Sequence, residues 1–282
     1  MANIALILAG GSGARMHQNI PKQFLTINDR PVIVYTMEAF QNHADINAIA
    51  VVCIAGWEPV LKAYAEQFNI TKLKHIVTGG ENGQASIRNG IFELEKNYAR
   101  DDIVLIHDGI RPLVSAEIIS DCIVTTKKYG SAISSVPCYE PVMRTEDGLK
   151  TCDFYPREKL RRSHTPHGFP IGKIADMHRL ALERGITNAV SSNTMLFDLG
   201  EQVYFSAGSE KISSSRPLRI SKFLKRCLSP RKPTGSNEVA TCILSMNFTR
   251  RTLRALRRKI CRGKNFRAKL YSSRARRGLS AR

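Results

Sequence analysis

Long apolar runs are absent from this sequence of 282 residues. The longest, such as 4–9 and 103–106, are far shorter than the about 20 residues that span a bilayer, and no charged leader precedes the first of them. CxxC pairs are also absent, and the number of cysteines, seven, is odd. These absences argue against a membrane-spanning or disulfide-stapled protein, and they predict a cytoplasmic protein with free thiols.

Acidic residues are nearly absent from the last quarter of the chain. Residues 1–210 contain 21 Lys and Arg against 23 Asp and Glu, whereas residues 211–282 contain 22 against 1. The net charge of +19 therefore describes one end of the chain and says little about the partners of the rest. We predict a globular body at 1–211, with enough apolar residues for a buried core, and a poorly ordered basic tail at 212–282.

Short β-branched apolar runs alternate with longer amphipathic stretches in the body. The runs predicted as strands are 4–9, 48–55, 74–80, 102–108 and 131–138. The stretches predicted as helices are 31–43, 58–68, 84–98 and 115–130. Such alternation predicts an α/β fold with a mostly parallel sheet and helices on both faces. Because ligands of such sheets bind beyond the carboxyl ends of the strands, we look for chemistry in the loops that follow them.

The first of these loops, LAGGSGARM at 8–16, is rich in glycine. Glycine lets backbone N–H groups approach an anion closely, so the loop suits a chain of phosphates. It is neither a Walker loop nor a good dinucleotide fingerprint, because Met16 stands where the third glycine should be. Arg15 and Lys22 lie around the end of the loop, where they would neutralise charge that develops at an attacked phosphorus. The alternative is a glycine turn with two solvated cations.

Two further loops carry candidate residues. GGENGQASIRNG at 79–90 is a second glycine-rich turn, which either holds a base through backbone groups or simply starts a helix. IHDGIRP at 106–112 ends a strand in Asp108, and Arg111 follows. A carboxylate at a strand tip opposite a phosphate loop is a natural Mg²⁺ ligand. The alternative is an aspartate that caps the next helix.

The segment YPREKLRRSHTPHGF at 155–169 places Arg157 before a predicted helical turn and Thr165 at the end of that turn. His164 and His167 suggest a metal site, but no cysteine or carboxylate partner lies nearby, so we predict ordinary polar roles. No cysteine lies in an electropositive turn of the body, so none is a candidate nucleophile.

Four motifs of the body resemble those of a known family. They are LAGGSGARM with PKQF, GG-x5-S at 79–86, HDGIRP, and PRE followed by TPH. In this order they resemble the 2-C-methyl-D-erythritol 4-phosphate and ribitol 5-phosphate cytidylyltransferases, over residues 2 to 211. The resemblance implies a Rossmann-like three-layer α/β/α fold of the nucleotide-diphospho-sugar transferase type. It also implies a homodimer clasped by an arm around 138–155, with Mg²⁺ and CTP as ligands.

The resemblance also implies a set of site residues. Arg15, Lys22 and Arg157 would take part in catalysis, Arg157 by positioning the polyol phosphate. The nucleotide would be held by Leu8, Ala9, Gly10, Gly11, Gly80, Glu81 and Ser86. Asp108 would meet the metal, and Arg111 and Thr165 would bind the acceptor. The implied reaction moves CMP from CTP to a polyol phosphate, releases pyrophosphate and needs no covalent enzyme intermediate.

The acceptor expected from the resemblance is one of two polyol phosphates. The erythritol branch has a threonine in the arm where this chain has Pro141. The pattern around HDGIRPL and PCYE is closer to the ribitol branch. Isoprenoid biosynthesis would use the erythritol product, and teichoic acid or capsule biosynthesis would use CDP-ribitol.

The tail departs from the family pattern altogether. After GSEK at 208–211 the family continues like NIKxTxPxD, with a lysine that orients the acceptor phosphate, whereas this chain has KISSSRPLRISKFL at 211–224. With suitable codons for KNIKLTTPEDIEIFK, deletion of one A from the opening run of adenines gives this peptide at every position. Our hypothesis is that 212–282 arises from a single-base deletion. Ser214 would then stand in place of that lysine, and activity would be low or absent.

Two other interpretations stay open. In one, the tail is a genuine arm that binds nucleic acid nonspecifically through its Lys and Arg residues. In the other, the body is a nucleotidyltransferase for a different nucleoside triphosphate.

Overall fold

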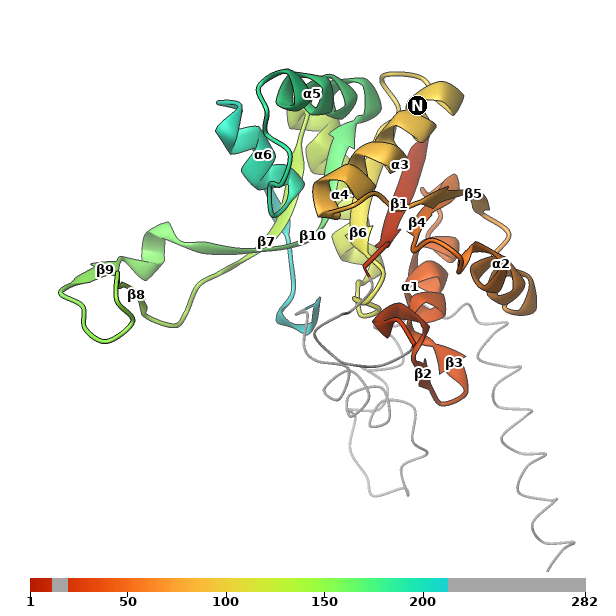
Figure 1. The fold of residues 1–282 in the computed structure, drawn as a ribbon, viewed down its shortest axis with the longest axis horizontal. Helices are drawn as coiled ribbons and strands as arrows, with labels where there is room; N and C mark the ends of the chain where they lie inside the picture. Colours follow the sequence, from red (N-terminus) through yellow and green to blue (C-terminus); the bar gives the residue numbers. More distant parts are fainter. Residues whose placement is uncertain (12–19, 213–282) are drawn as a thin grey trace, which may run out of the picture. The chain divides into compact units, whose positions relative to one another are not determined.

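A seven-stranded sheet forms the centre of the body (Figure 1). The structure, a computed structural model, describes residues 1–11 and 20–212. The strands lie in the order β11, β7, β10, β6, β1, β4, β5. Their bounds are β1 Asn3–Ala9, β4 Ala48–Cys53, β5 Leu73–Thr78, β6 Ile103–Asp108, β7 Ala132–Pro137, β10 Arg161–Pro170 and β11 Phe205–Ala207. Within this sheet only β10 runs antiparallel to its neighbours.

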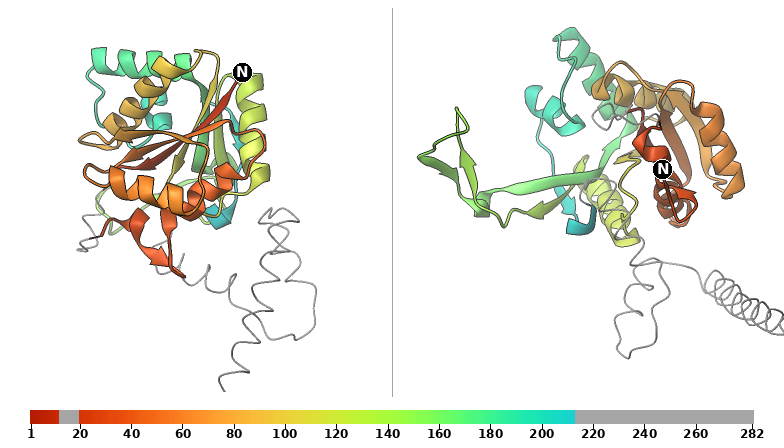
Figure 2. Two further views of the ribbon diagram at one scale, coloured as in Figure 1. Left: turned by 90° about the vertical axis from the view of Figure 1, so that its right-hand side faces the viewer. Right: turned by 60° about the horizontal axis from the view of Figure 1, so that its bottom comes forward.

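Helices cover both faces of this sheet (Figure 2). One face carries α1 (Val32–Gln41), α2 (Glu58–Gln67) and α4 (Ala116–Tyr129). The other carries α3 (Gly83–Asn97), α5 (Ile171–Glu183) and α6 (Ser192–Asp198). Alternation along β1 divides the core, because Ala5 and Ile7 pack with the first group and Ile4 and Leu6 with the second. The predicted three-layer α/β/α fold is confirmed.

The five predicted strands and four predicted helices are all present. They correspond to β1, β4, β5, β6 and β7 and to α1, α2, α3 and α4. In β4 every residue is buried, as expected of a parallel strand covered on both faces.

The prediction for 155–169 is right for its first part and wrong for its second. A helical turn, η3 (Arg157–Lys159), is present, but Thr165 lies inside β10 instead of ending that turn. The backbone of β10 pairs with β6 on one side and β7 on the other, and the register with β7 shifts between Ser163 and His167. This irregularity accommodates a proline in the strand, so pairing across the sheet decides the conformation.

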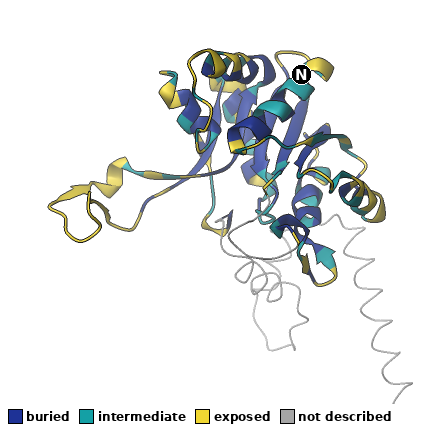
Figure 3. Cartoon of the chain, in the orientation of Figure 1, coloured by how far each residue is buried: buried dark blue, intermediate teal, exposed yellow. Residues whose placement is uncertain are grey.

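An arm leaves the sheet between β7 and β10, at the predicted position. It carries a hairpin of β8 (Val142–Arg144) and β9 (Asp153–Tyr155). Figures 1 and 2 show this hairpin extending away from the sheet, and Figure 3 shows that nearly all of it is exposed. Its apolar residues are exposed too, Met143 by 62%, Leu149 by 91% and Phe154 by 66%. An isolated two-stranded hairpin has little stability of its own.

Shorter elements complete the described chain. They are η2 (Lys22–Phe24), β2 (Thr26–Ile27), β3 (Arg30–Pro31) and η4 (Glu210–Ile212). Ile212, the first residue of the predicted tail, is 1% exposed and belongs to the core on the α1 and α4 side. The rest of that tail, 213–282, lies outside the described residues. Among the residues that the structure describes, no helix is both long and apolar enough to cross a membrane.

Candidate active site at the carboxyl edge of the sheet

The carboxyl ends of four parallel strands meet at one edge of the sheet. Ala9 of β1 is in register with Cys53 of β4, which is in register with Thr78 of β5, and Leu8 is in register with Asp108 of β6. The loops after these strands therefore begin side by side although they are far apart in sequence. Ligands of parallel α/β sheets bind at this edge, where the sequence predicted the site.

The first glycine turn touches the second through its backbone. Gly10 follows β1 directly, and a Cβ at this position would lie 3.3 Å from Ser86 Oγ and 3.5 Å from Gly79 Cα. A Cβ at Gly79 would in turn lie 3.3 Å from Gly10 Cα and from the carbonyl of Cys53. A larger residue at either glycine would push the two turns apart, so the glycines are needed for close packing.

The second glycine turn links β5 to α3. Ser86 is buried, and its Oγ accepts a hydrogen bond from the backbone N–H of Gly80 at 3.0 Å. A Cβ at Gly80 would lie 2.6 Å from Ala85 Cβ, so only glycine fits there. Asn82 caps α3 by accepting a hydrogen bond from Ala85 N at 2.9 Å, and Glu81 is exposed. The turn is thus held by the helix that it starts.

Lys22 begins η2, which brings the chain back to the first turn. The next residue, Gln23, is buried and donates from Nε2 to the carbonyl of Ala9 at 2.6 Å and to that of Gly11 at 3.2 Å. These bonds hold the backbone of Lys22 beside the turn. The partner cation predicted at Arg15 lies outside the described residues.

Asp108, Arg111 and Thr165 form a connected group at the same edge. Arg111 Nε donates to Asp108 Oδ2 at 2.6 Å, and Arg111 Nη1 donates to the carbonyl of Ile212 at 2.9 Å. The backbone N–H of Asp108 donates to Thr165 Oγ1 at 3.4 Å. The predicted metal ligand and both predicted acceptor residues are therefore brought together from β6, the loop after it and β10.

Asp108 has the chemistry of a Mg²⁺ ligand. It does not cap the next helix, because the N-cap of α4 is Ser115, so that alternative is wrong. No group of three or more His, Cys, Asp and Glu that could hold a metal is found among the described residues. Mg²⁺ takes one or two carboxylates and completes its shell with phosphate oxygens and water, so one carboxylate that is 33% exposed beside a phosphate loop fits the ion.

The histidines of this region are buried and neutral. Burial lowers the pKa of His107 and of His167 to about 4, and it lowers the pKa of His164. His107 Nε2 donates to the carbonyl of Arg111 at 3.0 Å, which supports the loop after β6. These contacts agree with the ordinary polar roles predicted from the sequence.

The described cysteines are free thiols and carry no catalytic signature. Cys53, Cys122, Cys138 and Cys152 form no disulfide. Burial raises the pKa of Cys53 and of Cys122 to about 12, so neither forms the thiolate that a nucleophile needs.

Arg157 is not brought to the other site residues within one chain. It begins η3, which follows β9 on the arm, and its described polar contact is a pair with the neighbouring Glu158 at 3.3 Å. No hydrogen bond or ion pair between described residues joins Arg157 to Asp108, Arg111 or Thr165. A role at this edge would require an arm from another copy of the chain.

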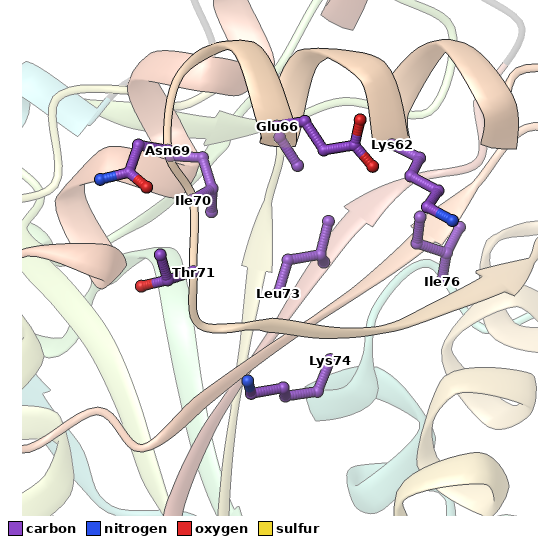
Figure 4. A pocket seen from close by; sticks show the side chains of 9 residues that line it. Lys62, Glu66, Asn69, Ile70, Thr71, Leu73, Lys74 and Ile76 are labelled. Atoms are coloured by element: carbon purple, nitrogen blue, oxygen red, sulfur yellow. The ribbon is translucent and has the colours of Figure 1, made fainter.

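A hollow of 640 Å³ lies elsewhere, between α2 and the start of β5 (Figure 4). Its lining includes Lys62 and Glu66 of α2 and Leu73 and Lys74 of β5. β5 is the outermost strand of the sheet, and its amino end is opposite the edge described above. None of the predicted site residues lines this hollow.

Two buried glutamines were missed from the sequence. Gln23 braces the first turn, and Gln84 links the second turn to the chain before α6, donating to the Ile186 carbonyl at 2.6 Å and accepting from Ala189 N at 2.7 Å. Both lie inside motifs quoted above, Gln23 in PKQF and Gln84 in GGENGQASIRNG. A long uncharged amide next to a glycine turn was the available signal, since it can satisfy backbone groups that a turn leaves unpaired.

The edge suits the transfer of a group between two anionic ligands. The backbone of two glycine turns beside Lys22 would suit a chain of phosphates, and Arg111 with Thr165 would suit a second, smaller anion. No nucleophile paired with a base is seen at this edge among the described residues. Direct transfer between two bound ligands, driven by positioning and charge, is the chemistry that the arrangement supports.

Comparison with known proteins gives one consistent picture. A family model described as 2-C-methyl-D-erythritol 4-phosphate cytidylyltransferase matches residues 3–223. A ribitol-5-phosphate cytidylyltransferase of Lacticaseibacillus paracasei is 41% identical over 209 residues, which cover 73% of this chain and 89% of the relative. A 2-C-methyl-D-erythritol 4-phosphate cytidylyltransferase of Syntrophotalea carbinolica is 35% identical over 186 residues, 65% of this chain and 78% of the relative.

A solved structure shares the fold. The crystal structure of the 2-C-methyl-D-erythritol 4-phosphate cytidylyltransferase of Francisella tularensis is similar with a TM-score of 0.67 and 20% identity, over 80% of this chain and 99% of that chain.

Proposed function

The chain belongs to the 2-C-methyl-D-erythritol 4-phosphate cytidylyltransferase family and moves CMP from CTP to a polyol phosphate, and we propose that this acceptor is ribitol 5-phosphate. The products would be CDP-ribitol, an activated unit for teichoic acid or capsule biosynthesis, and pyrophosphate. The observation that carries the proposal is the meeting of two interlocked glycine turns with the Asp108, Arg111 and Thr165 group at one sheet edge. Ribitol is favoured over erythritol because the ribitol relative is 41% identical and the erythritol relative 35%.

The proposed reaction is an in-line displacement. An oxygen of the acceptor phosphate attacks the α-phosphorus of CTP, and the bond from that phosphorus to the oxygen bridging to the β-phosphate breaks. Lys22 and Arg15 stabilise the charge on the α-phosphate during the transfer, and Arg111 and Thr165 hold the acceptor. The backbone of Leu8 to Gly11 and of Gly80 and Glu81, together with Ser86, holds the nucleotide.

Asp108 would hold Mg²⁺ together with phosphate oxygens of CTP. When bound, the ion neutralises phosphate charge and orients the leaving pyrophosphate. The pairing of Asp108 with Arg111 places the metal ligand next to the acceptor-binding guanidinium, so both ligands would be aligned by one group of side chains.

A homodimer completes the proposed site. The arm carries Arg157 away from the sheet of its own chain and exposes apolar residues such as Leu149 and Phe154. A second copy would cover those residues and bring its own Arg157 to the acceptor. Both features are explained by one exchange of arms between two copies.

The test is an assay of pyrophosphate release with each of CTP, UTP, ATP and GTP, and with ribitol 5-phosphate or 2-C-methyl-D-erythritol 4-phosphate as acceptor. It is run on this chain and on a version in which one A is restored before codon 212. We expect turnover with CTP and ribitol 5-phosphate, strongest in the restored version. Turnover with another triphosphate, or only with the erythritol acceptor, would contradict the proposed specificity.

The origin of the tail is tested separately by resequencing the gene across the Lys211 codon. An intact reading frame that encodes the same residues would end the hypothesis of a single-base deletion. Retention on DNA at low salt that is lost on truncation after Ile212, which keeps the core residue, would instead support a nucleic-acid-binding arm.

A further inference from the structure

Gln23 contacts the first glycine turn, yet no step of the proposed reaction uses this residue. Its side chain is 3% exposed and sits between two carbonyl oxygens of the first turn, at 2.6 Å from Ala9 O and 3.2 Å from Gly11 O. Burying an amide costs free energy unless its hydrogen bonds are made. The bonds from Gln23 to the two carbonyls offset that cost.

The two bonds of Gln23 fix the peptide planes around Gly10. In a trans peptide the carbonyl and the following N–H point in opposite directions. Fixing the carbonyl of Ala9 therefore fixes the direction of the N–H of Gly10. The Ala9 carbonyl also accepts a hydrogen bond from Ile54 N at 3.1 Å, so β4 and Gln23 hold it together. Glycine has wide backbone freedom, and these hydrogen bonds restrict that freedom before a ligand binds.

The element that carries Gln23 is itself anchored to α2. Phe24, the next residue, is 3% exposed and stacks on Trp57 with the ring centroids 4.6 Å apart. Tyr64 of α2 lies on the same ring, with its centroid 6.5 Å from that of Phe24. The order of contacts from the turn outward is thus the first turn, Gln23, Phe24 and Trp57.

We propose that Gln23 is the positioning residue of the first glycine turn, Leu8 to Gly11, which it holds in the conformation that binds the nucleotide. This inference rests on the proposed function, because it takes CTP as the ligand of that turn. Gln23 acts on the backbone of the turn and on the placement of Lys22, and it does not touch the reacting atoms.

Gln23→Met tests the two hydrogen bonds of Gln23, because it removes the N–H donors of the side chain while keeping its length. The matched control is Gln41→Met. Gln41 is the last residue of α1, and it also makes two hydrogen bonds, accepting from Lys72 N at 2.8 Å and donating to Thr71 Oγ1 at 2.9 Å. The full chain is titrated with CTP in the presence of Mg²⁺, and binding is followed by calorimetry. Thermal melts of both variants record any loss of stability.

We expect Gln23→Met to weaken CTP binding about tenfold, because the turn loses the hydrogen bonds that hold it in its binding conformation before CTP arrives, while Gln41→Met leaves binding unchanged. A purely structural role of Gln23 predicts a lower melting temperature with normal CTP affinity of the folded protein, and this result would overturn the inference.

Gln23→Glu adds a readout that depends on protonation. An ionised carboxylate facing two carbonyls repels them, whereas a protonated one donates to one of them, and burial between carbonyls raises the pKa of a carboxyl group. The CTP affinity of this variant relative to wild type should therefore recover between about pH 8 and about pH 6. If the ratio of the two CTP affinities stayed constant across this range, the proposed role of the Gln23 hydrogen bonds would be wrong.

The two levels of failure are separable. If neither this chain nor the version with the restored reading frame binds CTP, the proposed function fails and the inference falls with it. If wild type binds CTP and Gln23→Met binds it equally well, only the inference fails.

Discussion

The sheet edge and the arm are built in opposite ways. At the edge, backbones touch at Gly10 and Gly79, and buried side chains such as Gln23 bond to groups that are distant in sequence. On the arm, apolar residues such as Leu149 are exposed, and polar contacts are local, as between Thr145 Oγ1 and Lys150 O at 2.8 Å. The described contacts of the edge are therefore made within one chain, whereas the arm exposes an apolar surface that a second copy would cover.

The largest contrast between the two regions should come from their lysines. Lys22→Ala removes a cation from the phosphate loop and should lower turnover about 10²–10³-fold, or about 2.7 to 4 kcal/mol of transition-state stabilisation. Lys150→Ala removes a cation from the tip of the exposed arm and should change turnover less than twofold, about the effect of a solvated surface charge. Initial rates in whichever version of the chain is active give both values. Equal effects would remove Lys22 from the proposed mechanism.

The same contrast explains how much was predictable from the sequence. β4 and α3 were predicted well, because 48–55 is a continuous apolar run and 84–98 has helical spacing, and burial on the sheet enforces both patterns. The place of Asp108 at the end of a buried strand also predicted it as a site residue, because the end of such a strand lies at the edge of the sheet.

What the sequence did not predict depends on contacts between distant segments. Thr165 was placed at the end of a helical turn, but β10 is set by pairing on both of its sides, and no local pattern encodes such pairing. Gln23 was missed for a similar reason, since its partners are two carbonyls of the preceding loop. The separation of Arg157 from the other site residues arises from the direction of the arm, which composition does not encode.

The next largest effect should be acid destabilisation of the sheet, since the arm contains no histidine. Burial lowers the pKa of His107, His167 and His178 to about 4 from an ordinary 6.5. The unfolded chain binds these protons first, so the stability they contribute is complete above pH 6.5 and is lost as pH falls toward 4, by about 3 kcal/mol per histidine. His178→Leu should remove about one third of this loss.

Urea unfolding at pH 7 and at pH 5 measures the part of this loss that falls between these two values, about 2 kcal/mol per histidine. His178 is the choice for substitution because neither ring nitrogen has a hydrogen-bond partner among the described residues and because it lies on α5, apart from the site. Unchanged pH dependence in His178→Leu would show that this histidine is already protonated or exposed in the native protein.

Two glycines provide a smaller contrast. Gly80→Ala would place a Cβ 2.6 Å from Ala85 Cβ, so it should destabilise the body by about 1 to 3 kcal/mol and weaken CTP binding. Gly148→Ala meets no atom, but Gly148 has φ +71°, so the substitution should strain only the hairpin by about 1 to 2 kcal/mol. Global melting should fall for Gly80→Ala and stay constant for Gly148→Ala. A fall in both would mean that the arm is part of the folded core.

The smallest predicted signal is the one that connects the two regions. If the edge of one chain works with Arg157 of another, Lys22→Ala and Arg157→Ala chains should complement each other when they are unfolded together and refolded. Half of the dimers would be mixed, and each mixed dimer would have one site with both residues intact, so about one quarter of wild-type activity should return. Each variant refolded alone should stay inactive. A site completed within one chain cannot be restored by mixing, so absence of recovery in a mixed dimer would refute the exchange of arms while leaving the chemistry of the sheet edge intact.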